Sequence, residues 1–486
     1  MKETLARPVS YMLMVGLVIA LLIPCLWQPH IEAGDLASHL YSAWLAGQVQ
    51  RGTLPGLTLA HPATNVLADW GLEALSNAFG PDWAARVVAA LAVQIFFWGA
   101  FSWITVVHDR YPWIVAPFLA MLAYGLIFRF GFLNFYLSTG LTLWLMAVLW
   151  RPRWNRFFMA LPVALLAFLA HPLPLVWGLL ALGYVRFAER LNEKMRVLLL
   201  PTAFALLILI QTGLTALYPN RWSLAQIGDL GGILGLVGAG QFWIYGSKYL
   251  IIVAASLLLW SALFLERIDQ RGTLSDPIVH LWCLNIASFV LLPFGIQFPH
   301  YSFGLLFISQ RISLFVAILF CAVIGGCRYG RGMTRLSAVV AAAFFTFVYM
   351  DERAMNLVQA QIGALLAGLP PGQRVVVVLQ DTASGGLNGL VHIGSGACLG
   401  HCFDYANYEA ATGQFRIRVA GPNSFVAPTM KLVGEMESGQ HIVTPAEAPL
   451  YSVCPSTNPS QRFILRKLEA GDKTCLTRLQ VSPQFF

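Results

Sequence analysis

Long apolar segments alternate with short polar ones over the first 350 residues of the chain. Because about 20 apolar residues cross a bilayer as one helix, each such segment predicts a membrane-spanning helix. The first follows Lys2 and Arg7, as a signal peptide would, but its apolar run is long and no small-residue cleavage site follows. We therefore expect it to be retained. Eleven spans are predicted, at residues 9–28, 84–107, 112–128, 132–150, 157–171, 173–187, 196–217, 246–265, 277–298, 303–326 and 336–350.

The basic residues predict the orientation of these spans. Most of those before residue 351 fall in the segments that share a side with the N-terminus, and basic residues prefer the cytoplasmic side. An odd number of spans then places the C-terminal region on the other side. The sequence predicts an integral membrane protein with a cytoplasmic N-terminus and a C-terminal domain on the periplasmic or extracellular side.

Two polar segments on the predicted outer side are too long to be turns. Residues 29–83 contain HIEAGDLASHLYSAWLAGQVQRG and NVLADWGLEALSNAF, whose apolar positions predict two helices. We expect the first to be amphipathic and to lie on the membrane surface. Residues 218–246 are rich in glycine and predict a mobile or re-entrant loop.

From residue 351 the composition becomes that of a soluble domain. A helical segment that ends at Gly and Pro precedes short strand-like runs, RVVVVL, GQFRIRV and QRFILRKLE, so residues 351–486 predict a small α/β domain. Two disulfides with open connectivity are expected, and a zinc site that includes His392 and His401 is the alternative. The four cysteines of this segment are Cys398, Cys402, Cys454 and Cys475.

Composition excludes an ordinary soluble protein and gives no sign of nucleic-acid binding. Hydrophobic residues make up 57% of the chain, charged residues make up 11%, and the mean hydropathy is +0.66. The net charge is +8. Residues 351–486 carry as many acidic as basic side chains, so the excess of basic residues lies in the predicted membrane domain, residues 1–350. There it indicates which side of the membrane each connecting segment faces.

Three titratable residues lie where the first apolar segment ends. Glu32, Asp35 and His39 are spaced so that one helix face would carry all three. A charged group close to a bilayer is costly and is by default a functional candidate. The alternative is that Glu32 and Asp35 only stabilise the N-terminus of the following helix.

Two stretches of the sequence resemble members of the GT-C superfamily of polyprenyl-phosphate-dependent glycosyltransferases. GDLASHLYSAWLAGQVQRGTLPG is similar to the first-loop motif of poorly characterised bacterial members, and FLNFYLSTGLTLWLMAVLWRP is similar to their fourth span. The resemblance covers roughly residues 8–350. It implies a polytopic α-helical fold, a polyprenyl-phosphate-linked sugar as donor, and a glycan, lipid or protein acceptor.

The resemblance also implies roles for acidic residues. Asp35 occupies the place of the residue that acts as general base or orients the acceptor. Many members carry a second acidic residue directly beside it, where this chain has Leu36, so Glu32, Asp69 and Glu73 are the candidates for a second carboxylate. Some members need a divalent metal, and Asp35 with His39 has the spacing of metal ligands.

A leaving polyprenyl phosphate gains negative charge, so a fixed cation beside it is expected to stabilise the transition state. Arg311 and Arg129 lie within apolar segments and are the first candidates, with snorkelling to the headgroups as the alternative. Weaker candidates, for which headgroup contacts or a structural role are the alternatives, are His300, Arg221, Lys248 and His171.

The resemblance thus implies a glycosyltransferase of the bacterial inner membrane that acts on the periplasmic side, where the C-terminal domain would also lie. The alternative is a GT-C-like scaffold without catalysis, or a transporter or assembly subunit for lipid-linked glycans, whose C-terminal domain recruits a partner. A transporter is expected to show repeated halves with broken helices, and the sequence shows no such repeat.

Overall fold

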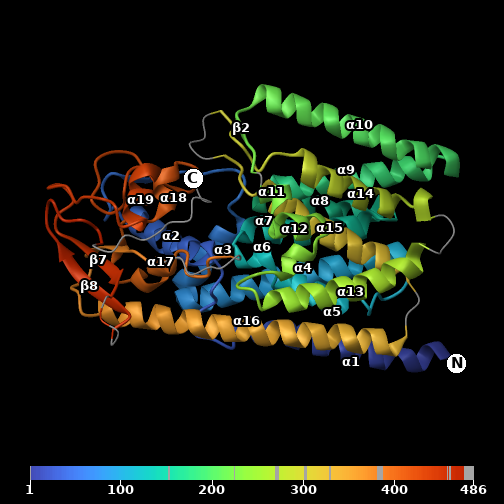
Figure 1. Ribbon diagram of the computed structural model, residues 1–486, viewed down its shortest axis with the longest axis horizontal. Coiled ribbons are helices and arrows are strands. Elements are labelled where there is room, and N and C mark those ends of the chain that lie inside the picture. The colour runs from blue at the N-terminus through green and yellow to red at the C-terminus, as the bar shows by residue number, and fades with distance from the viewer. Residues whose placement is uncertain are drawn as a thin grey trace.

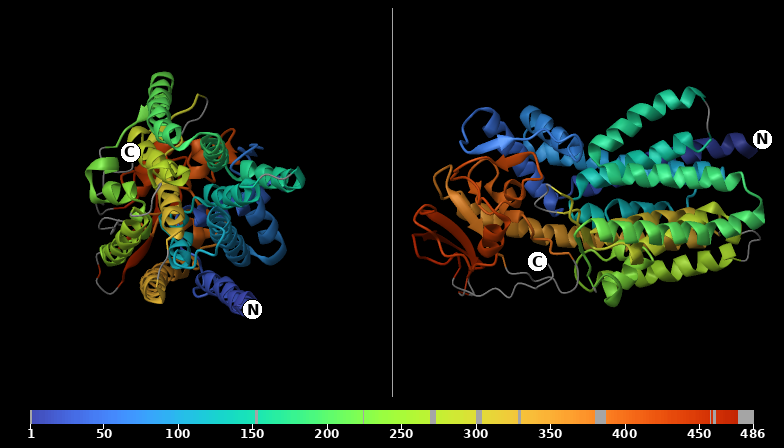
Figure 2. Two further views of the ribbon diagram at one scale, coloured as in Figure 1. Left: turned by 90° about the vertical axis from the view of Figure 1, so that its right-hand side faces the viewer. Right: turned by 90° about the horizontal axis from the view of Figure 1, so that it is seen from above.

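The structure is a computed structural model in which most residues are helical. Helices gather in a bundle at one end of the molecule, and a smaller mixed part of helices and strands covers the other end (Figures 1 and 2). The structure describes residues 2–151, 154–223, 225–268, 273–299, 304–327, 330–379, 387–456, 458 and 461–475.

The bundle fits a helical membrane protein. Within the described ranges, α4, α10, α13, α15 and α16 are long and apolar enough to cross a membrane, and five further apolar helices are shorter. The helices of the bundle are α1 (Lys2–Leu22), α4 (Pro81–His108), α5 (Ala116–Ala123), α6 (Leu126–Arg129), α7 (Leu133–Leu149), α8 (Trp154–Ala170), α9 (Pro172–Glu189), α10 (Glu193–Leu217), α13 (Tyr249–Ile268), α14 (Pro277–Leu291), α15 (Ile308–Gly325) and α16 (Arg331–Leu366), with short 3₁₀ turns η1 (Ile23–Cys25) and η3 (Thr273–Ser275).

The segment predicted as one span at 112–128 is two helices. α5 ends at Ala123 and α6 begins at Leu126. Between them Gly125 lies so close to the carbonyl oxygen of Gln241 that a Cβ there would sit 2.9 Å from it. The close approach of another backbone therefore accompanies the break.

The glycine-rich segment 218–246 is packed on the bundle. It contains β2 (Asn220–Arg221), α11 (Ala225–Gly228), α12 (Leu230–Leu236) and η2 (Ala239–Phe242), and β2 pairs antiparallel with β3 (Gly295–Ile296). Gly238 has φ +79°, and a Cβ on it would lie 2.7 Å from the backbone nitrogen of Ala317 in α15. The glycine content here permits close packing of the segment against α15.

The mixed part combines the first outer segment with the C-terminal region. Its helices are α2 (Asp35–Gln50), α3 (Leu67–Phe79), α17 (Ile393–Cys398), α18 (Tyr408–Thr412) and α19 (Met430–Glu437). Its strands are β1 (Leu57–Leu59), β4 (Arg374–Val377), β5 (Phe403–Asp404), β6 (Ile417–Val419), β7 (Leu450–Pro455) and β8 (Phe463–Leu468), and the sheet order is β5-β4-β7-β8. The two predicted helices of 29–83 and the predicted strands are confirmed.

The first outer segment and the C-terminal region share one core. β1 pairs antiparallel with β6, which places Leu57 opposite Val419. Tyr41 and Leu45 of α2 are buried in the same cluster as Val358 of α16. α2 is therefore covered by later parts of the chain, and the prediction that it lies on the membrane surface is wrong.

α16 passes without a break through the predicted boundary between residues 350 and 351. Its apolar first half belongs to the bundle, and its second half reaches the mixed part (Figure 1). The separate helix predicted after residue 351 is the second half of α16. A change of composition marks a change of surroundings here and does not end the helix.

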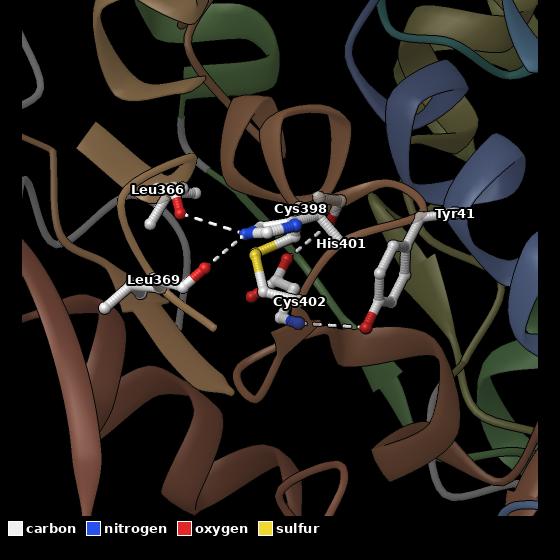
Figure 3. The surroundings of a disulfide bond; sticks show 8 residues. Tyr41, Leu366, Leu369, Cys398, His401 and Cys402 are labelled. Atoms are coloured by element: carbon white, nitrogen blue, oxygen red, sulfur yellow. Dashed lines mark hydrogen bonds between the residues drawn. A yellow bond between two sulfur atoms is a disulfide. The ribbon is translucent and has the colours of Figure 1, made fainter. Parts of the chain in front are cut away.

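Two disulfides join the predicted cysteines, Cys398 with Cys402 and Cys454 with Cys475. Figure 3 shows the first of them beside the end of α16, where the imidazole Nε2 of His401 lies 3.0 Å from the carbonyl oxygens of both Leu366 and Leu369. The backbone N–H of Asp404 donates to the hydroxyl of Tyr41 at 2.9 Å. This contact ties α2 to the strand that follows the disulfide.

Candidate functional site

Asp35 is held at the N-terminus of α2 by two glycines. Its backbone N–H donates to the carbonyl oxygen of Phe130 at 3.0 Å. Gly34 has φ +40°, and a Cβ there would lie 2.4 Å from that oxygen; Gly131 has φ +79°, and its Cβ would lie 2.4 Å from the nitrogen of Asp35. Only glycine allows this approach, so the loop between α6 and α7 fixes the start of α2.

The C-terminal region supplies the polar partners of Asp35. The Nε2 of His392 lies 3.3 Å from Oδ1 of Asp35, whose side chain is 23% exposed. The hydroxyl of Tyr408 donates to the same carboxylate, and the Tyr408 ring stacks on His392 with centroids 4.7 Å apart. Burial disfavours the imidazolium, but the hydrogen bond and charge of Asp35 outweigh it and raise the pKa of His392.

Arg311 lies in the first turn of α15 without a carboxylate in contact. Its Nε donates to the carbonyl oxygen of Leu306 at 3.3 Å, and its guanidinium lies over the rings of Phe132 and Phe135, 4.2 Å and 4.7 Å from their centroids. Its Nη1 is buried and has no hydrogen-bond partner among the described residues. Arg311 thus keeps an unused donor.

An aromatic pair links Asp35 to Arg311. The backbone carbonyl of Phe130 accepts the Asp35 N–H, and the Phe130 ring stacks on the Phe132 ring with centroids 5.0 Å apart. The guanidinium of Arg311 lies over the other partner of this stack, the Phe132 ring. Asp35 is the one carboxylate whose charge is felt at Arg311 among the described groups. The acidic and basic candidates therefore approach the same place from α2 and α15.

His171 lies at the edge of this place. Its ring meets the Phe135 ring edge-on with centroids 5.5 Å apart, on the ring that also carries Arg311. Its Nδ1 accepts the backbone N–H of Leu173 at 3.2 Å and caps α9. The structural role that the sequence left open is thus present.

His39 and Asp69 belong to a buried network of charges. The Nδ1 of His39 lies 3.0 Å from Oδ1 of Asp69 and 3.3 Å from Oε1 of Glu409. Asn134 donates to Asp69 at 2.7 Å, and Ser38 donates to Glu409 at 3.0 Å. The network joins α2, α3, α7 and α18.

The network fixes the charge of His39. Burial disfavours the imidazolium, but the Asp69 and Glu409 carboxylates outweigh it and raise the pKa of His39 to about 10. The same imidazolium outweighs burial at Asp69 and lowers the pKa of its carboxyl. His39 is therefore a poor proton acceptor at neutral pH, and its place is structural.

Glu32 and Glu73 are separate from Asp35. Glu73 binds Arg416 at 2.5 Å and accepts from Gln50 at 2.9 Å, which ties α3 to the C-terminal region. Glu32 is 5% exposed and lines a hollow together with Leu36 and Leu40. Neither pairs with Asp35 as a second catalytic carboxylate would.

Arg129 is fully buried and forms an ion pair with Glu352 of α16. Its Nη1 also donates to the carbonyl oxygen of Glu32 at 3.1 Å, and the indole N–H of Trp27 donates to Glu352. A buried guanidinium needs such a counter-charge. Arg129, predicted as a ligand of the donor phosphate, is therefore paired with Glu352 instead.

The weaker cationic candidates lie apart from Asp35. Lys248 pairs with Asp351 at 2.5 Å, and that carboxylate also accepts from Tyr249 at 2.6 Å. Arg221 is exposed in β2. His300 lies outside the described residues.

The described residues do not fit a metal site. No group of three or more His, Cys, Asp or Glu side chains among them has the geometry to hold an ion. Asp35 faces His392, whereas His39 faces Asp69, so the two predicted ligands do not converge. The four cysteines form disulfides, which leaves no thiolates for the alternative zinc site.

Sequence reasoning missed the roles of His392, Tyr408, Glu409 and Glu352. For Glu352 a signal existed, because an arginine in an apolar segment needs a carboxylate, and Asp351 and Glu352 are the two acidic residues that follow the last apolar run. His392 was considered only as a zinc ligand. No local pattern connects the C-terminal residues to Asp35.

Comparison of the chain with protein-family models, curated proteins and solved structures finds no match. The functional evidence is therefore the geometry of Asp35 and Arg311.

Proposed function

We propose that the protein is a membrane glycosyltransferase of the GT-C type that transfers a sugar from a polyprenyl-phosphate donor to an acceptor at the outer end of the bundle. The single observation that carries the proposal is the approach of the partly exposed Asp35 to Arg311, whose Nη1 lacks a partner. The predicted eleven-span topology and periplasmic C-terminal domain are parts of this proposal, and the apolar helices of the bundle support it.

In the proposed reaction the acceptor hydroxyl oxygen bonds to the anomeric carbon while the bond from that carbon to the phosphate oxygen breaks. The electron pair leaves with the polyprenyl phosphate, and the hydroxyl proton passes to Asp35. Arg311 stabilises the charge that develops on the phosphate. His392 and Tyr408 orient the Asp35 carboxylate.

The scheme assigns no role to a metal, and the described residues contain no group of three or more His, Cys, Asp or Glu side chains that could hold one. Electrostatic stabilisation falls to Arg311. Its contacts with Phe132 and Phe135 fix the guanidinium before a donor arrives, so little reorganisation is needed during the reaction.

The test supplies purified protein in lipid nanodiscs with radiolabelled polyprenyl-phosphate sugars and a membrane extract as acceptor. We expect transfer by the wild type and a loss of at least about 100-fold in Asp35→Asn and in Arg311→Met. The control is Asp109→Asn, whose exposed carboxylate pairs with Arg151 at the far end of α4 and which is expected to retain the wild-type rate.

Equal transfer by Asp35→Asn and the wild type would overturn the proposal. No transfer by any protein over the range of sugars would favour the alternative, a GT-C-like scaffold without catalysis.

A further inference from the structure

The hollow lined by Glu32 lies where the bundle meets the mixed part. It encloses about 480 Å³ with its open mouth included. Its wall comes from the segment after α1, from α2, from the first turns of α4, from α16 and from the α17 region. The lining residues are Pro29, His30, Ile31, Glu32, Leu36, Ala37, Leu40, Asp82, Ala85, Arg86, Gln359, Gly396 and Leu399.

Glu32 is the buried acidic group of this hollow, whose other carboxylate, Asp82, is exposed and lies 3.4 Å from Nδ1 of His30. It is 5% exposed, and its Oε1 is buried without a hydrogen-bond partner among the described residues. Burial first, and then the charge of Glu352, raise the pKa of Glu32 to about 8, and a ligand cation beside the group would favour its ionised form. A buried carboxyl oxygen without a partner is costly, so a ligand that donates a hydrogen bond would relieve it.

Arg86 is the basic group of the hollow, and no carboxylate neutralises it among the described residues. Its Nη2 donates to the carbonyl oxygens of Gln28 and Pro29 at 3.2 Å and 2.9 Å, which fixes the guanidinium but leaves its charge unpaired. Its Nε is buried without a partner. The guanidinium also lies 5.4 Å from the centroid of the Trp83 ring.

The hollow lies at the boundary of the predicted membrane. α4 is one of the helices that can cross a bilayer, and Arg86 lies near its start. Trp83 and Leu26 are each 55% exposed, and exposed tryptophans are typical of the level of the lipid headgroups. Most of the remaining lining is apolar.

We propose that this hollow binds the phosphoethanolamine group of a glycerophospholipid, with the phosphate at Arg86 and the ammonium at Glu32. A phosphate takes charge-assisted hydrogen bonds from a guanidinium, and a primary ammonium donates to a carboxylate. The glycerol and acyl chains would extend along the exposed apolar side chains around Trp83. The site includes neither Asp35 nor Arg311, so the proposal does not depend on sugar transfer.

Other headgroups fit the two charges less well. A phosphocholine has no N–H to donate to Oε1 of Glu32, and a phosphoglycerol carries no cation. The soluble compound O-phosphoethanolamine has the same two groups without acyl chains. The apolar wall and the exposed Trp83 and Leu26 favour the lipid as the source.

The test measures lipid binding to the purified full chain by native mass spectrometry. Phosphatidylethanolamine, phosphatidylcholine and phosphatidylglycerol with identical acyl chains are titrated separately. We expect the wild type to bind phosphatidylethanolamine about tenfold more tightly than the other two, the ratio that one charge-assisted hydrogen bond gives. Equal affinity for the three lipids would overturn the proposal.

Variants separate the two contacts. We expect Glu32→Gln to lower the affinity for phosphatidylethanolamine about tenfold without weakening phosphatidylglycerol, and Arg86→Gln to weaken both. Ala37→Leu fills the hollow without a change of charge and should block binding in a chain whose thermal unfolding midpoint is preserved. Asp109→Asn is the matched acidic control, and Arg151→Gln is the basic one.

Soluble O-phosphoethanolamine identifies the source of the headgroup. Competition by the soluble compound at similar concentration would support recognition of the headgroup alone, and failure to compete would support recognition of the whole lipid. An unchanged preference in both Glu32→Gln and Arg86→Gln would show that bound lipids lie elsewhere, and would overturn the site.

Discussion

Arg129 and Arg311 both lie in apolar helices of the bundle, but their surroundings differ. Arg129 is fully buried, contacts the carboxylate of Glu352 and donates to the backbone of Glu32. Arg311 is only half-buried and contacts two aromatic rings and one carbonyl oxygen, and Asp35 provides its only neighbouring negative charge among the described groups. One cation is neutralised by the fold, and the other is left available.

A charge in an apolar segment is marked as costly by its location, but its location does not decide its role. Both positions are costly, so both attracted the same functional prediction. The partner then decides the role. A counter-charge in direct contact satisfies an arginine structurally, whereas a guanidinium held only by aromatic rings can accept an anionic ligand.

Glu352→Gln should have the largest effect on stability, because it leaves Arg129 buried without its counter-charge. We expect a loss of about 3–5 kcal/mol in the free energy of unfolding, measured by denaturant titration of the protein in detergent. Asp109→Asn removes an exposed pair and should cost under about 1 kcal/mol. Equal losses in the two variants would mean that Arg129 does not depend on Glu352 as its counter-charge, and the contrast with Arg311 would disappear.

The His39 network should make stability depend on pH. Because the folded pKa of His39 is raised from 6.5 to about 10, its contribution is fully present below pH 6.5 and is lost as the pH rises towards 10. We expect a decline on the order of 4 kcal/mol over this range, measured as the unfolding midpoint at each pH. His39→Gln should flatten the profile; a parallel profile in this variant would assign the decline to other groups.

Gly131→Ala should disturb the start of α2. The new Cβ would lie 2.4 Å from the nitrogen of Asp35, and φ is +79°, so we expect a loss of about 2–3 kcal/mol. Gly80→Ala is the matched control, because Gly80 has φ +86° but no atom within 4 Å of the added Cβ; it should cost about 1 kcal/mol. Thermal unfolding compares the two, and equal losses would show that the approach of the backbones is not tight.

Arg311→Met should have the smallest effect on stability, within about 1 kcal/mol, because no carboxylate in contact is left behind and an apolar replacement suits the two rings. The same substitution should abolish binding of a polyprenyl phosphate, measured by native mass spectrometry. A large destabilisation, similar to that of Glu352→Gln, would make Arg311 a structural residue as well.

The local structure could be predicted where the pattern is local. Apolar runs of sufficient length mark the helices of the bundle, and the periodicity of 29–83 gives α2 and α3. The end of the last span could not be found in this way, because helical backbone bonds continue through Asp351 and Glu352 regardless of the solvent on each side. Composition reports the environment of a helix more directly than its ends.

The candidate site could be predicted only in part. Asp35 and Arg311 were found because each is costly at a membrane boundary. His392, Tyr408 and Glu409 reach α2 from the other end of the sequence, and the contacts depend on how the C-terminal region folds over the first outer segment. Long-range pairing of this kind leaves no periodic trace in either segment.

The pairing of β1 with β6 sets an order for biosynthesis. Residues 57–59 are made early, but their partner strand, residues 417–419, emerges from the ribosome only after all of α16 has been made. Until then the edge of β1 and the inner face of α2 have no cover from their own chain. A nascent chain released before residues 417–419 would expose both, so the first loop reaches its final packing only once β6 has been made.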